Sequence, residues 1–497
     1  MLPLLLAVSA LWAQHVLAAT PADWRSRSIY QVMTDRFART DGSTTASCDT
    51  SQQDYCGGTW AGIANHLSYI QGMGFNAIWI SPITMNLQQS TSDGTSYHGY
   101  WQQDMNSLNT PFGSENDLQN LISAVHAAGM YIMVDVVFNH GGWDGAPSSV
   151  DYGDFDPLNE QSMYHPYCAI DYSNQTSVEV CWGGSTNVPL PDFRTEASNV
   201  ASTLYSWASN FVSTYNIDGL RLDSASHVNM GFWSGLESAV GVYCVGEVYD
   251  DRPSYVCPYQ ENLDAVLNYP TYYNITDAFA STSGDMYGLA NNINTMKSTC
   301  KDTTLLGSFS ENHDVPRFAQ QNGDINAAKN VLTYTILADG IPIIYEGQEQ
   351  HYNSEGGSGV PYNREALWLS GYNTQATLYT TVAQLNQIRN HAIYIDSEYL
   401  TYQNWPIYTD TTTVAMRKGA DGKAMITVVS NKGSNGASYT QNIPNTGLPA
   451  NTETTEILSC ASLTTGSDGS LTVPMAQGLP RVYYITSALS QSGICGH

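Results

Sequence analysis

The chain has 497 residues, a length typical of about three domains. It carries 18 Lys and Arg against 45 Asp and Glu, and the resulting formal charge of −27 disfavours nucleic acid and anionic membranes as partners, because carboxylates repel phosphate. Charged residues make up only 13%, against about 25% in ordinary globular chains. Tyr (33) and Trp (11) are abundant instead, and such a surface suits a secreted protein that binds sugars.

Residues 1–18 predict a secretory signal peptide. An apolar run, shorter than the roughly 20 residues that span a membrane, is followed by Val16 and Ala18 at the −3 and −1 positions of a cleavage site. The alternative is a membrane anchor. We expect a secreted, extracellular protein whose mature chain begins at Ala19 or Thr20.

Nine cysteines fit an oxidising compartment. Eight paired cysteines allow 105 connectivities, but close spacing favours Cys48–Cys56 and Cys168–Cys181, and Cys257–Cys300 and Cys460–Cys495 would follow as the next neighbours. Cys244 would then stay free within an apolar run, as a buried and inert thiol. Asn174 and Asn274 begin sequons and are candidate glycosylation sites.

Short, nearly continuous apolar runs predict buried parallel strands. They cover residues 75–83, 130–140, 217–225, 242–248, 305–312 and 341–347. Helical patterns fill the gaps: Ser114 is positioned to cap one helix, and an apolar stripe from Val200 to Phe211 marks another. Repeated strand–helix units over roughly 250 residues predict a (β/α)8 TIM barrel, formed by residues 19–140 and 195–398. A doubly wound sheet is the alternative, but no G-x-G-x-x-G follows a strand.

Two segments depart from the strand–helix pattern. The connection over residues 141–194 is far longer than the usual βα loop of about 2–6 residues, and it contains one pair of the cysteines. We expect a small inserted domain there, after the third strand. From residue 399 to 497 the pattern changes to period two, with a hairpin over 412–431 around a short Asp-Gly turn. This pattern predicts a C-terminal antiparallel β-sandwich domain.

Polar residues cluster where the predicted strands end. The set comprises Asp135, Asn139 and His140; Arg221 and Asp223; Glu247; and Asn312, His313 and Asp314. Active sites of barrels form at this end of the strands, and charged residues are otherwise scarce in the chain. Of two carboxyl groups that flank a glycosidic bond, one can protonate the leaving oxygen while the other attacks the anomeric carbon or activates water, so the cluster indicates glycoside hydrolysis. No G-x-S-x-G, H-E-x-x-H or P-loop pattern competes.

The same residues carry a family resemblance. DVVFNH (135–140), GLRLDSASH (219–227), GEV (246–248) and FSENHD (309–314) resemble, in order, the four sequence blocks of the α-amylase family of retaining glycoside hydrolases. LPDF (190–193) resembles the extra block in that family's inserted domain. The likeness is strongest to secreted fungal members of the Taka-amylase type, and it implies endo-hydrolysis of α-1,4-glucan. A transglycosylating or maltogenic relative is one alternative, and a non-catalytic glucan-binding protein is the other.

The resemblance implies a role for each matched residue. Asp223 would be the nucleophile, Glu247 the general acid and base, and Asp314 the stabiliser of the transition state. Further substrate contacts would come from His98, Tyr100, Trp101, His140, Arg221, His313 and Arg364. A structural calcium ion would be bound by Asn139, Glu179, Asp192 and the backbone carbonyl of His227. We expect a monomer.

Two positions depart from the closest relatives. Ser226 stands where many of them have a Lys that helps to hold glucose on the leaving-group side of the cleavage point. Val360 stands where they often have an Asp that contacts the far non-reducing side. The departures leave the three acids unchanged, so we expect them to alter the binding of oligosaccharides and not the chemistry.

Overall fold

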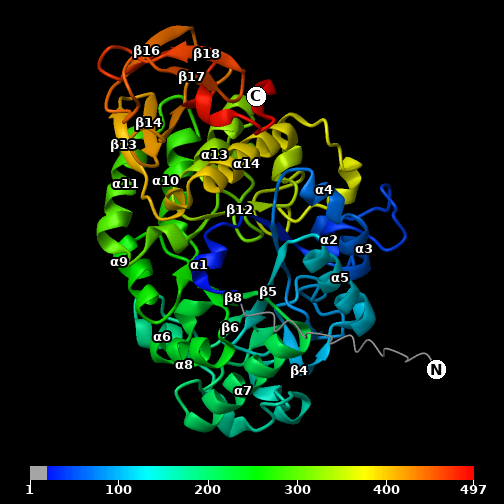
Figure 1. The fold of residues 1–497 in the computed structure, drawn as a ribbon. Helices are drawn as coiled ribbons and strands as arrows, with labels where there is room; N and C mark the ends of the chain where they lie inside the picture. Colours follow the sequence, from blue (N-terminus) through cyan, green and yellow to red (C-terminus); the bar gives the residue numbers. More distant parts are fainter. Residues whose placement is uncertain (1–18) are drawn as a thin grey trace, which may run out of the picture.

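The computed structural model describes residues 19–497, so the predicted signal peptide over residues 1–18 lies outside the described residues. In the described part of the chain, no helix combines the length and the apolar character that a membrane crossing requires. Figure 1 shows a central barrel with a C-terminal domain, drawn in orange and red, against helices α13 and α14.

Eight parallel strands form the barrel, in the order β10-β9-β8-β5-β2-β1-β12-β11. They are β1 (Ile29–Val32), β2 (Ala77–Ile80), β5 (Tyr131–Val137), β8 (Gly219–Asp223), β9 (Tyr243–Gly246), β10 (Ala265–Val266), β11 (Gly307–Ser308) and β12 (Ile341–Tyr345). A parallel bridge between Leu267 and Gly307 joins the last pair of strands and closes the ring. The predicted (β/α)8 barrel is therefore confirmed. The apolar runs had indicated six of its strands, and β1 and β10 were not among them.

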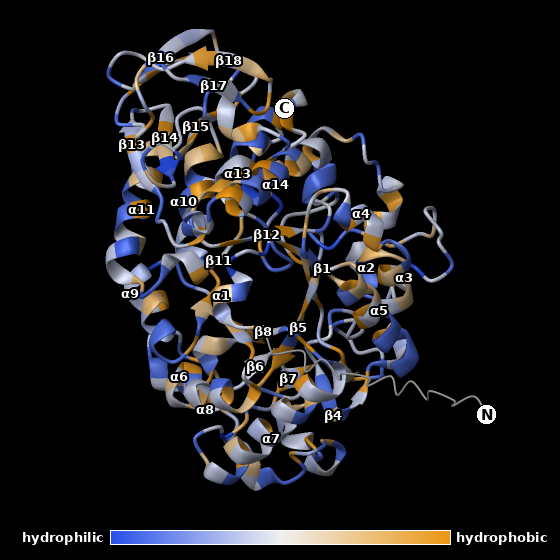
Figure 2. Cartoon of the chain, viewed as in Figure 1, coloured by the Kyte–Doolittle hydropathy of each residue, from blue (hydrophilic) through white to orange (hydrophobic). Residues whose placement is uncertain are grey.

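Helices surround the strands, and most bury one face, whereas α13 is buried almost all round because it packs against both β12 and β15. The longer ones are α5 (Glu115–Ala127), α7 (Ser198–Tyr215), α8 (Met230–Val240), α10 (Tyr269–Phe279), α11 (Met286–Thr299), α13 (Ile325–Leu337) and α14 (Thr377–Ile395). Ser114 caps α5 as predicted, in a reciprocal pair of hydrogen bonds with Asp117. The stripe from Val200 to Phe211 is the buried face of α7. Figure 2 shows hydrophobic residues concentrated on the strands and on the faces of α13 and α14.

Residues 141–194, between β5 and α7, contain only short elements. These are the 3-10 turns η3 (Pro147–Ser149), η4 (Tyr152–Asp154) and η5 (Gln161–Met163), helix α6 (Gln175–Val180), and strands β6 (Gly183–Gly184) and β7 (Pro189–Leu190). Backbone hydrogen bonds between Met105 and Asp156 (2.8 Å) and between Phe193 and Asn139 (2.9 Å) attach the segment to the barrel at both ends. The segment therefore lies over the carboxyl end of β5, beside the predicted catalytic residues.

The C-terminal part is antiparallel. One sheet has the order β13-β14-β15-β20-β17-β18, and β16 pairs with β19 in a second sheet. The strands are β13 (Trp405–Thr409), β14 (Thr413–Lys418), β15 (Met425–Ser430), β16 (Tyr439–Ile443), β17 (Glu453–Glu456), β18 (Ala461–Thr464), β19 (Leu471–Met475) and β20 (Arg481–Ile485). Apolar residues of both sheets, including Ile426, Ile443 and Val473, share one core. The hairpin of β14 and β15 is the one predicted from the sequence.

All four predicted disulfides are present. Cys244 is free and fully buried in β9. Burial raises the pKa of its thiol well above the usual range, which keeps it protonated and unreactive.

Candidate active site

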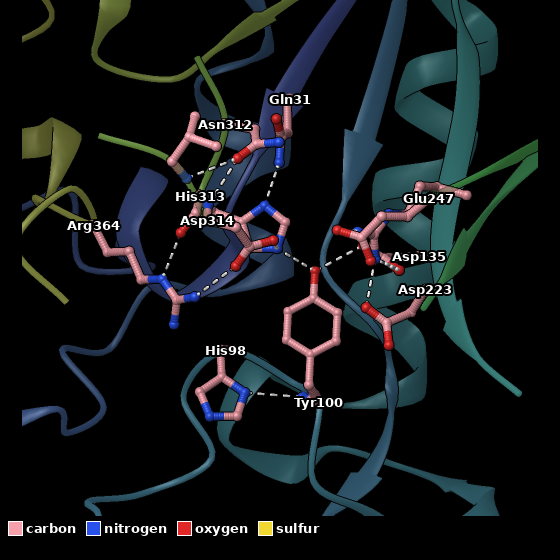
Figure 3. A network of polar contacts seen from close by, with 12 residues as sticks. Gln31, His98, Tyr100, Asp135, Asp223, Glu247, Asn312, His313, Asp314 and Arg364 are labelled. Atoms are coloured by element: carbon pink, nitrogen blue, oxygen red, sulfur yellow. Dashed lines mark hydrogen bonds and ion pairs between the residues drawn. The ribbon is translucent and has the colours of Figure 1, made fainter. Parts of the chain in front are cut away.

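The carboxyl ends of the barrel strands bring the predicted catalytic residues together (Figure 3). Asp135 on β5 is paired in register with Arg221 on β8, and Asp223 ends β8. Glu247 directly follows β9, and its backbone N–H donates to the carbonyl oxygen just before Asp223 (2.9 Å). Asp314 follows β11 on the opposite side of the ring. Parallel strands in register end at one rim, so residues far apart in sequence share one site.

Arg221 is the centre of the charged cluster. Its Nη1 lies 2.9 Å from Asp135 Oδ1 and 2.8 Å from Asp223 Oδ1, and its Nη2 lies 2.9 Å from Glu247 Oε1. The side chain is fully buried. Burial by itself would lower the pKa of Arg221, but the surrounding carboxylates raise it well above the ordinary value. A permanent positive charge thus fixes Oδ1 of Asp223, while no hydrogen bond from residues 19–497 reaches Oδ2.

Glu247 is held in a different way. Its Oε2 accepts a hydrogen bond from the Ser224 backbone N–H (3.0 Å), and its Oε1 accepts one from the Tyr269 hydroxyl (3.2 Å). Burial raises the pKa of Glu247 to about 7, with further contributions from the negative charges of Asp223 and Asp314 and opposition from Arg221. A carboxylic acid with such a pKa keeps its proton in weakly acidic solution and can donate it.

Asp314 has the opposite character. Arg364 Nη2 lies 3.1 Å from its Oδ1, and His313 Nε2 lies 3.2 Å from its Oδ2. Burial would raise the pKa of Asp314, but the His313 and Arg364 side chains lower it below the ordinary value. The site therefore contains both an acid that retains its proton, Glu247, and a carboxylate that stays ionised, Asp314.

A chain of hydrogen bonds orients the aromatic residues of the site. Gln31 Nε2 donates to His313 Nδ1 (2.8 Å), which leaves the His313 proton on Nε2, 2.6 Å from the Tyr100 hydroxyl. Tyr100 in turn donates to Asp135 Oδ2 (2.8 Å), which also accepts from Trp79 Nε1 (3.2 Å). Burial lowers the pKa of His313 to about 4, so the imidazole is neutral. Gln31, Trp79 and Tyr269 were not predicted from the sequence, since nothing in their local patterns distinguishes them from core residues.

The remaining predicted substrate residues line the same rim. His98 Nδ1 accepts from the Tyr100 backbone N–H (3.0 Å), and the rings of His98 and Trp101 are 4.7 Å apart. His140 Nε2 lies 3.2 Å from the Tyr100 carbonyl oxygen. Every residue predicted to catalyse or to bind substrate thus lies in one connected cluster with the three acids.

Ser226 and Val360, the two positions that depart from the pattern of similar family members, differ in their surroundings. Ser226 is 8% exposed. Its carbonyl oxygen accepts a hydrogen bond from Gln175 Nε2 (3.0 Å), and the Tyr255 hydroxyl donates to Oε1 of the same Gln175 side chain. Val360 is 44% exposed, in the loop before Arg364.

Oxygen atoms of the predicted calcium ligands lie close to one another. Asn139 Oδ1 lies 3.0 Å from the carbonyl oxygen of His227 and 3.1 Å from Asp192 Oδ2, and it faces no donor. Gln175 Nε2 donates to Glu179 Oε1 (2.9 Å) and to the carbonyl oxygen of Ser226 (3.0 Å), so Glu179 lies near the backbone next to His227.

Amide, carboxylate and carbonyl oxygens are the ligands that Ca²⁺ prefers, and a cation between these oxygens would relieve their repulsion. Reversing the amide of Asn139 would instead give hydrogen bonds to both neighbours. Within residues 19–497 no group of three or more His, Cys, Asp or Glu side chains could hold a metal, so any ion here would need amide and backbone oxygens in addition to carboxylates.

Comparisons with known proteins agree with this geometry. A family model described as the α-amylase catalytic domain matches residues 31–434, and one described as α-amylase domain C matches residues 406–497. Alpha-amylase 1 of Lipomyces kononenkoae is 55% identical over 481 residues, 97% of this chain and 77% of that protein. Alpha-amylase 2 of Schwanniomyces occidentalis is 48% identical over 480 residues, 96% of this chain and 94% of that protein.

A solved structure gives the same relationship. An α-amylase from Malbranchea cinnamomea matches with a TM-score of 0.93 and 50% identity, over 96% of this chain and 100% of that one. The similarity covers the barrel, the inserted segment and the C-terminal sheets together. On its sequence blocks, its fold and these matches, the chain belongs to the α-amylase family.

Proposed function

We propose that the chain is an α-amylase that hydrolyses internal α-1,4 bonds of starch, glycogen and maltooligosaccharides with retention of configuration. The observation that carries this proposal is the Arg221 guanidinium, which contacts both Asp223 and Glu247. One guanidinium between two carboxyl groups keeps them close, as a retaining pair needs. It also leaves Oδ2 of Asp223 free to attack.

The geometry supports a double displacement. Glu247 gives its proton to the glycosidic oxygen while Asp223 Oδ2 forms a bond to the anomeric carbon, and the leaving sugar departs with that proton. Glu247, now a carboxylate, takes a proton from water, whose oxygen attacks the same carbon and frees Asp223. Asp314 holds hydroxyls of the distorted ring, and the neutral His313 and His140 donate or accept hydrogen bonds beside it.

Hydrolysis of soluble starch tests the proposal, with viscosity and reducing ends followed together. Viscosity that collapses before many reducing ends appear indicates attack on internal bonds. If the two signals change in proportion, an exo-acting or maltogenic enzyme is the better description. Products longer than a short maltooligosaccharide substrate would indicate transglycosylation, and no change in either signal would indicate a non-catalytic binding protein.

The activity should fall on the alkaline side as Glu247 loses its proton. Because its pKa is about 7, kcat/KM should fall about tenfold per pH unit above that value. Measurement of kcat/KM on maltoheptaose from about pH 4 to about pH 9, with stability checked at each pH, tests this expectation. Full activity at a pH two units above 7 would contradict the assignment of Glu247.

We also propose a structural Ca²⁺ ion bound by Asn139, Glu179, Asp192 and the carbonyl of His227. The facing oxygens described above support it. When bound, the ion would neutralise two carboxylates and link the inserted segment to the barrel.

Removal of calcium should lower the melting temperature before it changes the chemistry. An ion that binds only the folded state stabilises it by about 2–4 kcal/mol at 100 to 1,000 times Kd. Thermal unfolding with and without a chelator measures the effect, and Glu179→Gln should reduce the difference. Restoration by Ca²⁺ but not by Mg²⁺ is the control. An unchanged melting temperature after thorough chelation would count against the site.

Ser226→Lys should improve the use of short substrates. A Lys ammonium can donate a charge-assisted hydrogen bond to a sugar hydroxyl on the leaving-group side, a gain of about 1–2 kcal/mol or up to about thirtyfold. The ratio of kcat/KM on maltotriose to that on soluble starch should rise, and the cleavage pattern should shift. Ser238→Lys, which adds the same charge on the exposed surface of α8, is the control. An unchanged ratio would mean that another residue serves this subsite.

We propose that the protein is secreted and acts as a monomer on its glucan substrate. Four disulfides support export to an oxidising compartment. Of the two sequons, Asn174 is exposed at the start of α6, whereas Asn274 is half-buried in α10 and donates to the Pro270 carbonyl (2.8 Å). Asn174 is therefore the more accessible glycosylation site.

A further inference from the structure

Another buried arginine, Arg317, lies in the same segment as the active-site residue Asp314. Arg317 is fully buried and immediately precedes α12 (Phe318–Gln321). Its Nη1 donates to the Glu346 carbonyl oxygen (2.7 Å) and to Glu311 Oε2 (3.3 Å), and its Nε donates to Glu365 Oε2 (3.1 Å). One side chain thus connects the segment after β11, the end of β12 and the loop that follows β12.

Both carboxylates that Arg317 contacts lie beside residues of the site. Glu311 precedes Asp314 by three positions in the same segment, and Glu365 directly follows Arg364. Arg364 contacts Asp314 (3.1 Å) and donates to the His313 carbonyl oxygen (2.9 Å). Arg317 therefore joins the two segments that also meet through the contact of Arg364 with Asp314.

Each of the two carboxylates also accepts a hydrogen bond from a backbone N–H. Glu311 Oε1 accepts from the Phe318 N–H (2.9 Å), and Glu365 Oε1 accepts from the Ser354 N–H (2.7 Å). If Arg317 were lost, Glu311 would remain buried, and Glu365 part-buried, without their cation. Buried charges without partners are strongly unfavourable, so the loops would have to rearrange.

The surroundings of Arg317 contain more acid than base. Glu346 is fully buried, and neither of its carboxyl oxygens has a hydrogen-bond partner within residues 19–497. With Glu311 and Glu365 it makes three carboxyl groups around one guanidinium. A pair that served only stability would not need this arrangement, since apolar residues of similar size stabilise a core at least as well.

We propose that Arg317 is a positioning residue, which acts through Glu311 and Glu365 to hold Asp314 and Arg364 in the geometry that stabilises the transition state. This inference rests on the proposed function and adds to it a residue that does not touch the substrate. Asp314 must contact the distorted ring more strongly than the relaxed one. A displacement of about 1 Å at such a group costs roughly a hundredfold in rate.

The test is a series of substitutions at Arg317, with kcat and KM measured separately on maltoheptaose. Arg317→Met should lower kcat by about a hundredfold and change KM by less than about threefold, because the lost interactions are made only in the transition state. Arg317→Lys keeps the positive charge but lacks the planar guanidinium that donates to several acceptors at once, so its kcat should lie between those of Arg317→Met and the wild type. The inhibition constant of acarbose, which resembles the transition state, should rise as kcat/KM falls.

Arg389 provides a matched control. It is also a buried arginine, but it donates to the carbonyl oxygens of Arg25 (2.9 Å) and Ser26 (3.3 Å), at the start of the described chain. Arg389→Met should lower the melting temperature and leave kcat of the folded enzyme unchanged. If Arg317→Met does the same, Arg317 has only a structural role and the inference is wrong.

If Arg317→Met fails to fold, a milder variant tests the same inference. Glu365 is part-exposed, and Glu365→Gln preserves its shape while removing its charge. It should lower kcat by about tenfold with KM nearly unchanged, and normal kcat would overturn the inference. Wild-type enzyme in the same assay separates the two proposals: an inactive wild type overturns both, whereas an active wild type with unaffected variants overturns only the role of Arg317.

Discussion

Asp223→Asn should reduce the hydrolysis of starch by several powers of ten while the fold and glucan binding persist. The amide that replaces the carboxylate cannot form the glycosyl–enzyme intermediate, and the loss of a nucleophile has effects of this size. The Asn side chain has nearly the same shape as the Asp side chain that it replaces, and Arg221 keeps its contacts with Asp135 and Glu247. The fold should therefore survive the change.

Turnover on soluble starch, thermal unfolding and retardation in a glucan-containing gel measure the three properties. Asp421→Asn is a matched control, because Asp421 also pairs with an arginine, Arg417 (2.6 Å), but lies exposed in the C-terminal domain. It should leave turnover unchanged. Retention of more than about a tenth of wild-type turnover by Asp223→Asn would rule out Asp223 as the nucleophile.

Glu247→Gln should have an effect of similar size on starch but a smaller one on an activated substrate. The glycosidic oxygen of starch needs the proton of Glu247 in order to leave. Fluoride does not, so α-maltosyl fluoride should still form the intermediate on Asp223. Azide should then accelerate turnover and yield α-maltosyl azide, since a small anion needs no general base.

Glu237 allows a matched comparison. Burial also raises the pKa of this carboxyl to about 7, but it lies on α8 and its Oε1 contacts the Asp264 backbone N–H. Glu237→Gln should leave both substrates unaffected. Equal losses on starch and on α-maltosyl fluoride in Glu247→Gln, without rescue by azide, would show that Glu247 does not act as the acid.

Much of the architecture follows from local sequence. Parallel strands covered on both faces are continuous apolar runs, and for this reason β2, β5, β8, β9 and β12 could be located. The neighbouring cysteines and the Asp-Gly turn of the β14–β15 hairpin are likewise local signals. The three acids could be found because the sequence blocks around them mark the ends of strands, where a barrel places its active site.

Two strands gave no such signal. β1 has four residues, one of them Gln31, and β10 has two. Gln31 interrupts the apolar run of β1, and β10 does not lie within a longer apolar run, as the equally short β11 does. Their place in the barrel is set by pairing with neighbours that the chain supplies elsewhere.

The sequence by itself predicted the barrel, the disulfides and the cluster of acids at the strand ends, because apolar runs, the order of the cysteines and the sequence blocks can all be recognised along the chain. Only the tertiary structure decided which groups orient those acids. Gln31 meets His313 across 282 positions, and Arg317 meets Glu365 across 48. Hydrogen bonds and burial, which set the pKa values of Glu247 and Asp314, arise from such distant contacts, and no local pattern records them.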